Sequence, residues 1–261
     1  MSFSTPSEIV AQVERASLSK VTLSTPRTLV AAMLAGIYIA MGGLLSLLIG
    51  YGFPEWTAGN PGLQRLLSGC MFPLGLILVV LAGAELFTGN NAVLIPGLIN
   101  RKYGIAPVLR NWALVYVGNF VGALFFVYIM IWCAGIVDAD PWKSAIVQIA
   151  QTKTSLPWGV VFVKGIGANW LVCLAVWLGF SAHSTAGKMM ALWFPVMCFV
   201  AIGYEHSIAN MFFIPLGMLQ GASVTWGQFL LDNLVPATLG NIVGGALFVG
   251  CVYTYLYLSR K

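Results

Sequence analysis

Long apolar runs dominate this sequence. They cover residues 29–51, 66–99, 112–136, 158–180, 189–219 and 229–258. The hydrocarbon core of a bilayer is about 30 Å thick, so a helix needs about 20 apolar residues to cross it. Only 8% of the residues are charged, whereas an ordinary soluble domain has about 25%. The pattern predicts an all-α integral membrane protein with six transmembrane helices.

Basic residues outside these runs indicate the orientation in the membrane. They lie before the first run, between the second and third, after the fourth and at the C-terminus: Arg15, Lys20, Arg27, Arg101, Lys102, Arg110, Lys188, Arg260 and Lys261. The loops on the other side are balanced or acidic. The positive-inside rule therefore predicts that both termini are cytoplasmic. It also accounts for the net charge of +5 without nucleic acid. The first residues lack the marks of a removable signal peptide.

The first 26 residues form a predicted amphipathic segment on the cytoplasmic side, and residues 27–261 form a single transmembrane domain. In "STPSEIVAQVERA", Thr5 is a candidate helix cap, with Pro6 in the first turn and Glu8 at the capping-box position. One face of this helix is apolar, with Ile9, Val10 and Val13. The helix either covers a pore mouth or anchors the chain to the membrane surface.

The second and fifth runs are too long for simple spans and resemble each other. "FPLGLILVVLAGAELFTGNNAVLIPGLI" begins at Phe72, and "FPVMCFVAIGYEHSIANMFFIPLGML" begins at Phe194. Each passes from Phe-Pro through an apolar half to an acidic residue, a polar break and a second half with Ile-Pro. The third and sixth runs share "LVYVGNFVGALFFV" and "PATLGNIVGGALFV". We therefore expect a repeat with halves at about 27–137 and 154–261. Three spans is an odd number, so the halves should be inverted, with the broken helices meeting near the membrane midplane.

The two breaks mark a candidate pathway. Unwound backbone is tolerated at that depth only where protein or a water-filled cavity satisfies its hydrogen bonds. The alternative is two proline-kinked helices without a transport role. The glycine pairs Gly118/Gly122 and Gly240/Gly244 fit close helix packing. The neighbouring Asn119 and Asn241 are better interpreted as interhelical hydrogen-bond partners than as substrate ligands.

The fifth-run break, "IGYEHSIANMFFIP", carries an acid and an imidazole. Ionisable groups at this depth cost about 2.5–3.5 kcal/mol on insertion scales and are functional candidates by default. His206 could exchange a proton near neutral pH; the alternative is a neutral structural histidine. Because Glu205 is adjacent, its side chain should point elsewhere, where it braces the break or holds a cation. His183 lies in a polar loop and is expected to be solvated.

Other polar residues could reach the same place. Thr88 lies at the first break, where its hydroxyl could donate a hydrogen bond to His206 or to a ligand. The alternative is that Thr88 caps a helix. Asn169 lies inside the fourth run, and Lys164 early in that run could snorkel or pair with an acid. Lys153 lies on the extracellular approach, although its position alone is that of an ordinary loop lysine.

Three motifs, "ELFTG", "KGIGANWLVCLAVW" and above all "GYEHSIANMF", resemble the formate/nitrite transporter family, and the spacing fits over essentially the whole chain. The resemblance implies an aquaporin-like protomer, a homopentamer with one pore per protomer, a multi-pass location in the prokaryotic plasma (inner) membrane, and permeation of formate, nitrite or hydrosulfide. It gives the site residues their expected roles. His206 matches the central pore histidine, Thr88 the threonine facing it, Asn169 the nearby asparagine, Lys153 the vestibule lysine and Glu205 its neighbouring acid. Phe72, Leu76 and Phe199 match the apolar constriction; spacing alone would assign them to the core.

Energetics suggest how such a pore could work. Moving a bare carboxylate through an apolar ring costs nominally tens of kcal/mol, whereas protonating an acid of pKa about 4 at pH 7 costs about 4 kcal/mol. One hypothesis is that Lys153 and half-helix ends draw the anion in and His206 relays a proton to it. In the rival mechanism the ion stays charged beside a protonated His206, with Thr88 and Asn169 as donors.

Other classes fit less well. An aquaporin should have two Asn-Pro-Ala boxes, but the only Asn-Pro, at Asn60, precedes Gly62. An ammonium channel should have two deep histidines. An intramembrane serine hydrolase should have Ser and His on facing helices, with Gly-x-Ser-x-Gly as one clue. In "GFSAH" the pattern around Ser181 ends in His183 instead of glycine, so an enzyme is not expected. The five cysteines lack paired spacing, and we expect no metal or cofactor. Among substrates, "TGNNAVLIP" favours formate by resemblance only, with nitrite or hydrosulfide as the alternative.

Overall fold

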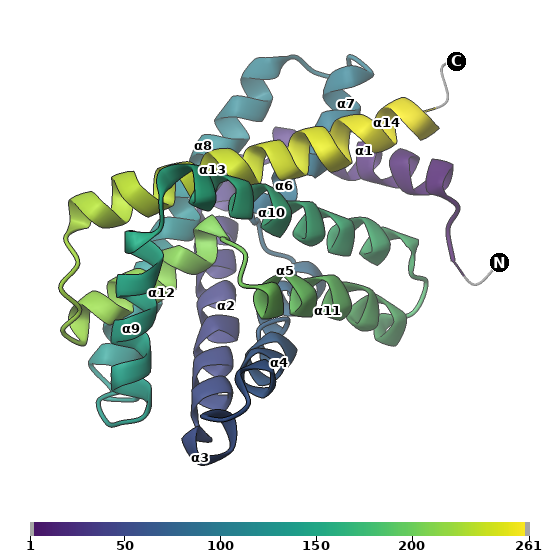
Figure 1. Ribbon diagram of the computed structural model, residues 1–261. Coiled ribbons are helices and arrows are strands. Elements are labelled where there is room, and N and C mark those ends of the chain that lie inside the picture. Colours follow the sequence, from purple (N-terminus) through teal and green to yellow (C-terminus); the bar gives the residue numbers. More distant parts are fainter. Residues whose placement is uncertain (1–2, 259–261) are drawn as a thin grey trace.

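Residues 3–258 are described by a computed structural model in which helices form the whole framework (Figure 1). Within this range there is no β-strand, only an isolated antiparallel bridge between Phe3 and Ala182. Six helical units are long and apolar enough to cross a membrane. They are α2 (Thr25–Tyr51), α4–α5 (Pro61–Met71 and Leu74–Ala82), α8–η1 (Ile105–Phe125 and Phe126–Trp132), α10 (Trp158–Ser181), α11 (Thr185–Ile202), and η2–α13–η3–α14 (Gln228–Leu234, Val235–Ile242, Val243–Cys251 and Val252–Tyr257). The prediction of six spans is confirmed.

The second and fifth spans are broken where the sequence predicted. After α5, the chain unwinds and continues as α6 (Phe87–Val93) and α7 (Ile95–Ile99); after α11, it unwinds and continues as α12 (Ser207–Leu219). Gly83 and Gly203 end the first segments with φ of 84° and 83°. Glycine adopts this left-handed conformation without steric strain because it has no Cβ, and a glycine in this conformation commonly ends a helix. Each of these two spans therefore consists of two half-helices, and the backbone groups at their inner ends lie inside the protein.

Two buried asparagines satisfy the unwound backbone. The Asn119 amide donates to the carbonyls of Ala32 and Glu85 at 2.7 and 2.9 Å, and its oxygen accepts from the Phe87 N–H at 3.0 Å. Buried backbone groups without partners would be costly at this depth. The corresponding asparagine of the other break makes the same three kinds of bond: Asn241 binds the carbonyls of Gly165 and Glu205 and the N–H of Ser207. Both asparagines are interhelical partners, as expected.

The paired glycines allow the helices to approach closely. A Cβ on Gly122 would overlap the Met33 carbonyl of α2, and one on Gly244 would overlap the Ile166 carbonyl of α10. Their role in packing is thus confirmed.

Two short amphipathic helices flank the spans at opposite ends. Helix α1 (Pro6–Thr22) begins with the predicted capping box between Thr5 and Glu8. Hydrogen bonds from Thr5 hold the pKa of Glu8 below its usual value. The apolar face of α1 is buried on the protein, where Ile9, Val10 and Val13 pack with Ala92, Val93, Trp177 and Val249.

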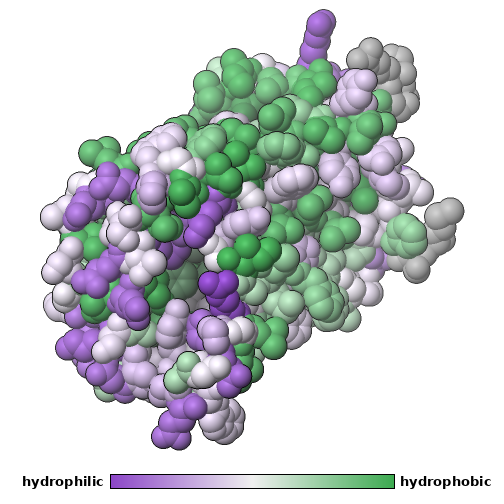
Figure 2. Space-filling model, viewed as in Figure 1, coloured by the Kyte–Doolittle hydropathy of each residue, from purple (hydrophilic) through white to green (hydrophobic). Residues whose placement is uncertain are grey.

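Helix α9 (Trp142–Ser155) was not predicted, and its residues were expected to lie in a loop. Its buried residues Ile146 and Ala150 are four positions apart, and both pack against Gly217 of α12. That spacing is a helical signal. In Figure 1, α9 and the short α3 (Pro54–Thr57) lie at one end of the molecule and α1 and α14 at the other. Figure 2 shows hydrophilic residues gathered around a hollow at the lower-left end, and mainly hydrophobic residues over the middle.

Candidate permeation pathway

Three cavities share lining residues and together run through the protein. The α9-side cavity has a volume of about 210 Å³ and lies between α2, α4, α9 and α12. A central chamber of about 10 Å³ shares Phe72, Phe199 and His206 with it. The α1-side cavity, of about 290 Å³, shares Leu76 and Leu86 with the chamber. Two vestibules therefore meet at one narrow point between the two breaks.

The central chamber is apolar apart from one imidazole. Its lining residues are Ile39, Phe72, Leu76, Leu86, Val172, Val196, Phe199 and His206. The rings of Phe72 and Phe199 meet edge to face with centroids 5.7 Å apart. A chamber of about 10 Å³ has room for about one water molecule. The three residues expected at the constriction thus all border this chamber.

His206 caps α12, which fixes its ring. Its Nδ1 accepts the Ala209 N–H at 3.1 Å, and its Nε2 lies 3.0 Å from the Thr88 hydroxyl. Because Nδ1 is an acceptor, a neutral ring carries its proton on Nε2 and donates it to Thr88. The ring stacks on Phe199 with centroids 5.7 Å apart. His206 thus presents one held proton at the narrowest part of the pathway.

Thr88 and Asn169 stand behind His206. Both are fully buried, and neither borders the three cavities. The Asn169 amide group reaches the Thr88 carbonyl at 3.1 Å, the Asn91 side-chain oxygen at 3.1 Å and the Asn241 carbonyl at 2.6 Å. An amide nitrogen has two hydrogens, so none is left for an ion in this arrangement. Asn169 positions Thr88, which in turn meets His206.

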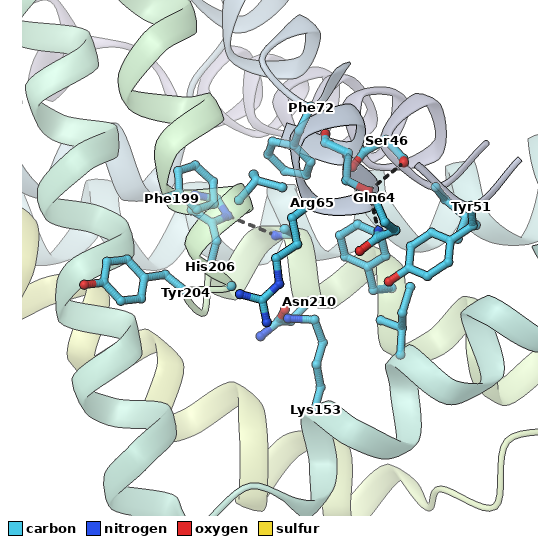
Figure 3. A pocket seen from close by; sticks show the side chains of 17 residues that line it. Ser46, Tyr51, Gln64, Arg65, Phe72, Lys153, Phe199, Tyr204, His206 and Asn210 are labelled. Atoms are coloured by element: carbon cyan, nitrogen blue, oxygen red, sulfur yellow. Dashed lines mark hydrogen bonds between the residues drawn. The ribbon is translucent and has the colours of Figure 1, made fainter. Parts of the chain in front are cut away.

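An ion pair lies at the inner wall of the α9-side cavity. Lys153 of α9 lines the cavity, and its Nζ is 3.0 and 3.1 Å from the two carboxylate oxygens of Glu205. Figure 3 shows Lys153 reaching from α9 toward Asn210. Asn210 and Asn233 donate to the same carboxylate at 2.7 and 3.2 Å. Glu205 therefore holds a cation, one of the two roles expected for it.

A second ion pair, which was not predicted from the sequence, lies in the α1-side cavity. Lys20 of α1 pairs with Glu85 at 2.7 Å, and both line the cavity. Asn90 donates to Glu85 at 2.7 Å and to Asn111 at 3.0 Å. In the sequence, Lys20 indicates only the orientation in the membrane, and Glu85 appears only as part of a motif. The available signal was the internal repeat, because Glu85 precedes its break as Glu205 precedes the other.

The two mouths have the same hydrogen-bond pattern. Asn210 donates to Asn233 at 2.7 Å, as Asn90 does to Asn111. Asn233 donates to the Lys153 carbonyl at 2.9 Å, as Asn111 does to that of Lys20 at 3.4 Å.

The match ends at the centre. One residue after the glutamate, the first half has Leu86 and the second half has His206. Three residues after the glutamate, the first half has Thr88 and the second half has Ile208. The His206–Thr88 pair stands where the two halves differ.

Three other residues singled out in the sequence lie off the pathway. His183 was expected to be solvated, but its Nε2 lies 3.0 Å from the Ser4 hydroxyl. This contact links the segment before α1 to the α10–α11 connection. The Ser181 hydroxyl donates to the Leu178 carbonyl. Lys164 makes no ion pair within residues 3–258, and its carbonyl accepts the Glu205 N–H at 3.3 Å.

The chain is similar to known transporters and channels. A family model described as "Formate/nitrite transporter" matches residues 7–255. The chain is 45% identical to a probable formate transporter of Methanothermobacter thermautotrophicus, over 97% of this chain and 94% of that protein. It is 39% identical to the formate channel BtFdhC of Bacillus thuringiensis, over 100% and 98%. It is 35% identical to the formate channel FocA of Escherichia coli, over 98% and 95%.

Two solved structures have the same fold. One, described as an FNT family ion channel, superposes with a TM-score of 0.87 at 30% identity and covers 95% of this chain and 98% of its own. The other, a pentameric formate channel with formate bound, superposes with a TM-score of 0.78 at 34% identity, over 90% and 98%.

Proposed function

Because the chain belongs to the formate/nitrite transporter family, a family of channels and transporters rather than enzymes, we propose that it conducts small weak-acid anions, with formate as the leading substrate. One observation carries the proposal: two charged vestibules meet at an apolar chamber whose only polar side chain is His206. Three similar proteins are named for formate, and one similar structure contains it. Nitrite and hydrosulfide are the competing substrates.

Each protomer forms one pore of a homopentamer in the inner membrane. A similar solved channel is pentameric, and six apolar helices suit a multi-pass protein. The positive-inside rule supports a cytoplasmic α1 side, because Arg27, Arg101 and Lys102 lie near that end, with Lys102 3.9 Å from Glu14 of α1. The α9-side cavity then faces the exterior.

The two halves form an inverted 3+3 repeat. The matching sets of lysine, glutamate and asparagine at the two mouths support this arrangement. Because Lys20 and Lys153 take part, the repeat units begin at α1 and α9. They are thus longer than the 27–137 and 154–261 expected from the sequence.

The substrate crosses the chamber without net charge. A chamber of about 10 Å³ strips away hydration water, and a bare carboxylate in such a place costs nominally tens of kcal/mol. Protonating formate at pH 7 costs only about 4 kcal/mol. The positive charge of the α9-side mouth draws the anion in, and the neutral acid crosses the apolar ring.

The proton arrives together with the anion. Resting His206 is neutral, because a proton on Nδ1 would face the Ala209 N–H. When an anion reaches the ring, the Nε2 proton passes to the anion oxygen as a proton from solvent in the α9-side cavity, which His206 lines, replaces it at Nε2. The result is a neutral acid and a neutral imidazole, and Nδ1 keeps the Ala209 N–H throughout. Beyond the chamber the acid releases its proton. Thr88 holds Nε2 in the required direction.

Uptake into proteoliposomes tests the function. Labelled formate is offered at several internal and external pH values, with nitrite and hydrosulfide as competitors. We expect rapid formate uptake that rises with an inward proton gradient and falls in His206→Phe. His183→Phe is the matched control, because this histidine lies outside the three cavities. Preference for nitrite would change the substrate, and absence of any anion flux would overturn the proposal.

A further inference from the structure

The α9-side cavity has a positive charge that no acid balances. Two basic side chains line it, Lys153 and Arg65. Glu205 offsets Lys153 at 3.0 Å. Arg65 has no acidic partner within 4.0 Å among residues 3–258. Two cations and one acid leave this mouth with one net positive charge.

The α1-side cavity is balanced. Its charged lining residues are Lys20 and Glu85, which pair at 2.7 Å. Arg65 lies 20 residues before Glu85, and the residue 20 before Glu205 is Thr185. The two mouths match in their lysine, glutamate and asparagines, but only one has the arginine.

Arg65 is placed to meet an entering anion. It projects from α4, two turns before Phe72 of the central chamber. Figure 3 shows its guanidinium extending away from Phe72 toward Lys153 and Asn210. The side chain is exposed, so an anion can reach it before losing its water. A guanidinium offers a planar fork of donors that fits two oxygens of one anion.

We propose that Arg65 is the anion-capture residue of the α9-side mouth, which gives this mouth a higher affinity for small planar oxyanions than the α1-side mouth. The inference rests on the proposed function. Formate and nitrite each have two oxygens for the fork, whereas hydrosulfide has a single acceptor atom. Arg65 therefore favours the planar oxyanions at entry.

Loss of this charge should change occupancy and leave permeability unchanged. We take the central chamber to be the main barrier of the pore. At low anion concentration the flux then depends on the difference in free energy between an anion in that chamber and one in bulk water, and the mouth site does not enter. A weaker mouth site raises the half-saturating concentration and the maximal rate together. Exposed ion pairs contribute modestly, so we expect an increase of about two- to fivefold.

The test uses right-side-out and inside-out membrane vesicles from cells without their own formate carriers, at equal pH and zero membrane potential. In the unmodified protein, the half-saturating formate concentration should be lower from the α9 side than from the α1 side. Arg65→Gln should raise the α9-side value about two- to fivefold, with low-concentration permeability and the α1-side value unchanged. Lys143→Gln is the matched control, an exposed α9 lysine that borders none of the three cavities.

Arg65→Lys separates charge from shape. It should restore the half-saturating concentration for hydrosulfide, because the charge is kept, and restore that for formate only in part, because the fork is lost. An unchanged α9-side value in Arg65→Gln, or equal shifts from both sides, would overturn the inference while leaving the pore intact. Absence of formate flux in the unmodified protein would instead overturn the proposed function.

Discussion

At the residue scale, the proposed proton transfer depends on His206, and the neighbours of this residue fix how its ring is held. The Ala209 N–H occupies Nδ1, and Thr88 meets Nε2 at 3.0 Å. Asn169 then holds the Thr88 carbonyl. This chain of bonds keeps one proton of the ring beside the chamber.

Removing the Thr88 hydroxyl should slow transport. In Thr88→Val the Nε2 proton loses its partner, and the ring is free to turn from its proton-transfer direction. We expect formate uptake to fall about tenfold or more, since positioned proton transfer contributes about 10²–10⁴-fold. Thr88→Ser keeps the hydroxyl and should retain most of the rate. Equal rates in the two variants would show that the hydroxyl has no role.

Removing Lys153 should harm the pore through Glu205. The Lys153 and Glu205 side chains are 18% and 4% exposed, so Lys153→Met leaves a buried carboxylate without its cation. Breaking such a pair costs about 3–5 kcal/mol, and the remaining negative charge repels entering anions. The melting temperature and formate uptake should both fall. In Lys153→Met/Glu205→Gln both should recover in part, and a further loss in the double variant would contradict this explanation.

The site residues differ in how visible they are in the sequence. His206, Glu205 and Thr88 could be found because polar groups interrupt apolar runs. Lys20 could not, because the positive-inside rule already accounts for a basic residue on the α1 side. Arg65 could not, because Glu55 balances its charge in the sequence between the first two spans. Phe72, Leu76 and Phe199 were available only by resemblance, since apolar side chains lining a pore look the same in sequence as those of a core.

At the scale of helices, the breaks depend on two glycines. Gly83 and Gly203 have φ near 84°, where a Cβ is strained by about 1–2 kcal/mol. Gly83→Ala and Gly203→Ala should each lower stability by about this amount, measured as thermal unfolding in detergent. Gly62→Ala, in the first turn of α4 with no atom near a new Cβ, should instead be neutral or slightly stabilising. A similar response at all three positions would contradict the role of the left-handed turns.

The sequence predicted the breaks and missed α9, and the reason is local. A break needs a polar run inside an apolar one, which is conspicuous. Helix α9 is short and half polar, and it is stabilised by packing of Ile146 and Ala150 on α12. Its pattern of four-residue spacing is present, but the long apolar runs on either side conceal it.

For the whole molecule, the six spans follow from hydrophobic length alone, because the bilayer sets that length. The pathway does not follow from length. It forms where residues far apart in the chain meet, as Thr88 and His206 do across 118 positions. The proposed inverted repeat explains the matching mouths, and the different centre explains where the chemistry lies.

The central claim is that formate crosses with a proton and without net charge. Its most direct test measures formate uptake, internal pH and membrane potential together in proteoliposomes driven by a formate gradient. The account predicts one proton taken up per formate and no potential generated by the flux. Formate entry that builds an inside-negative potential without internal acidification would contradict it.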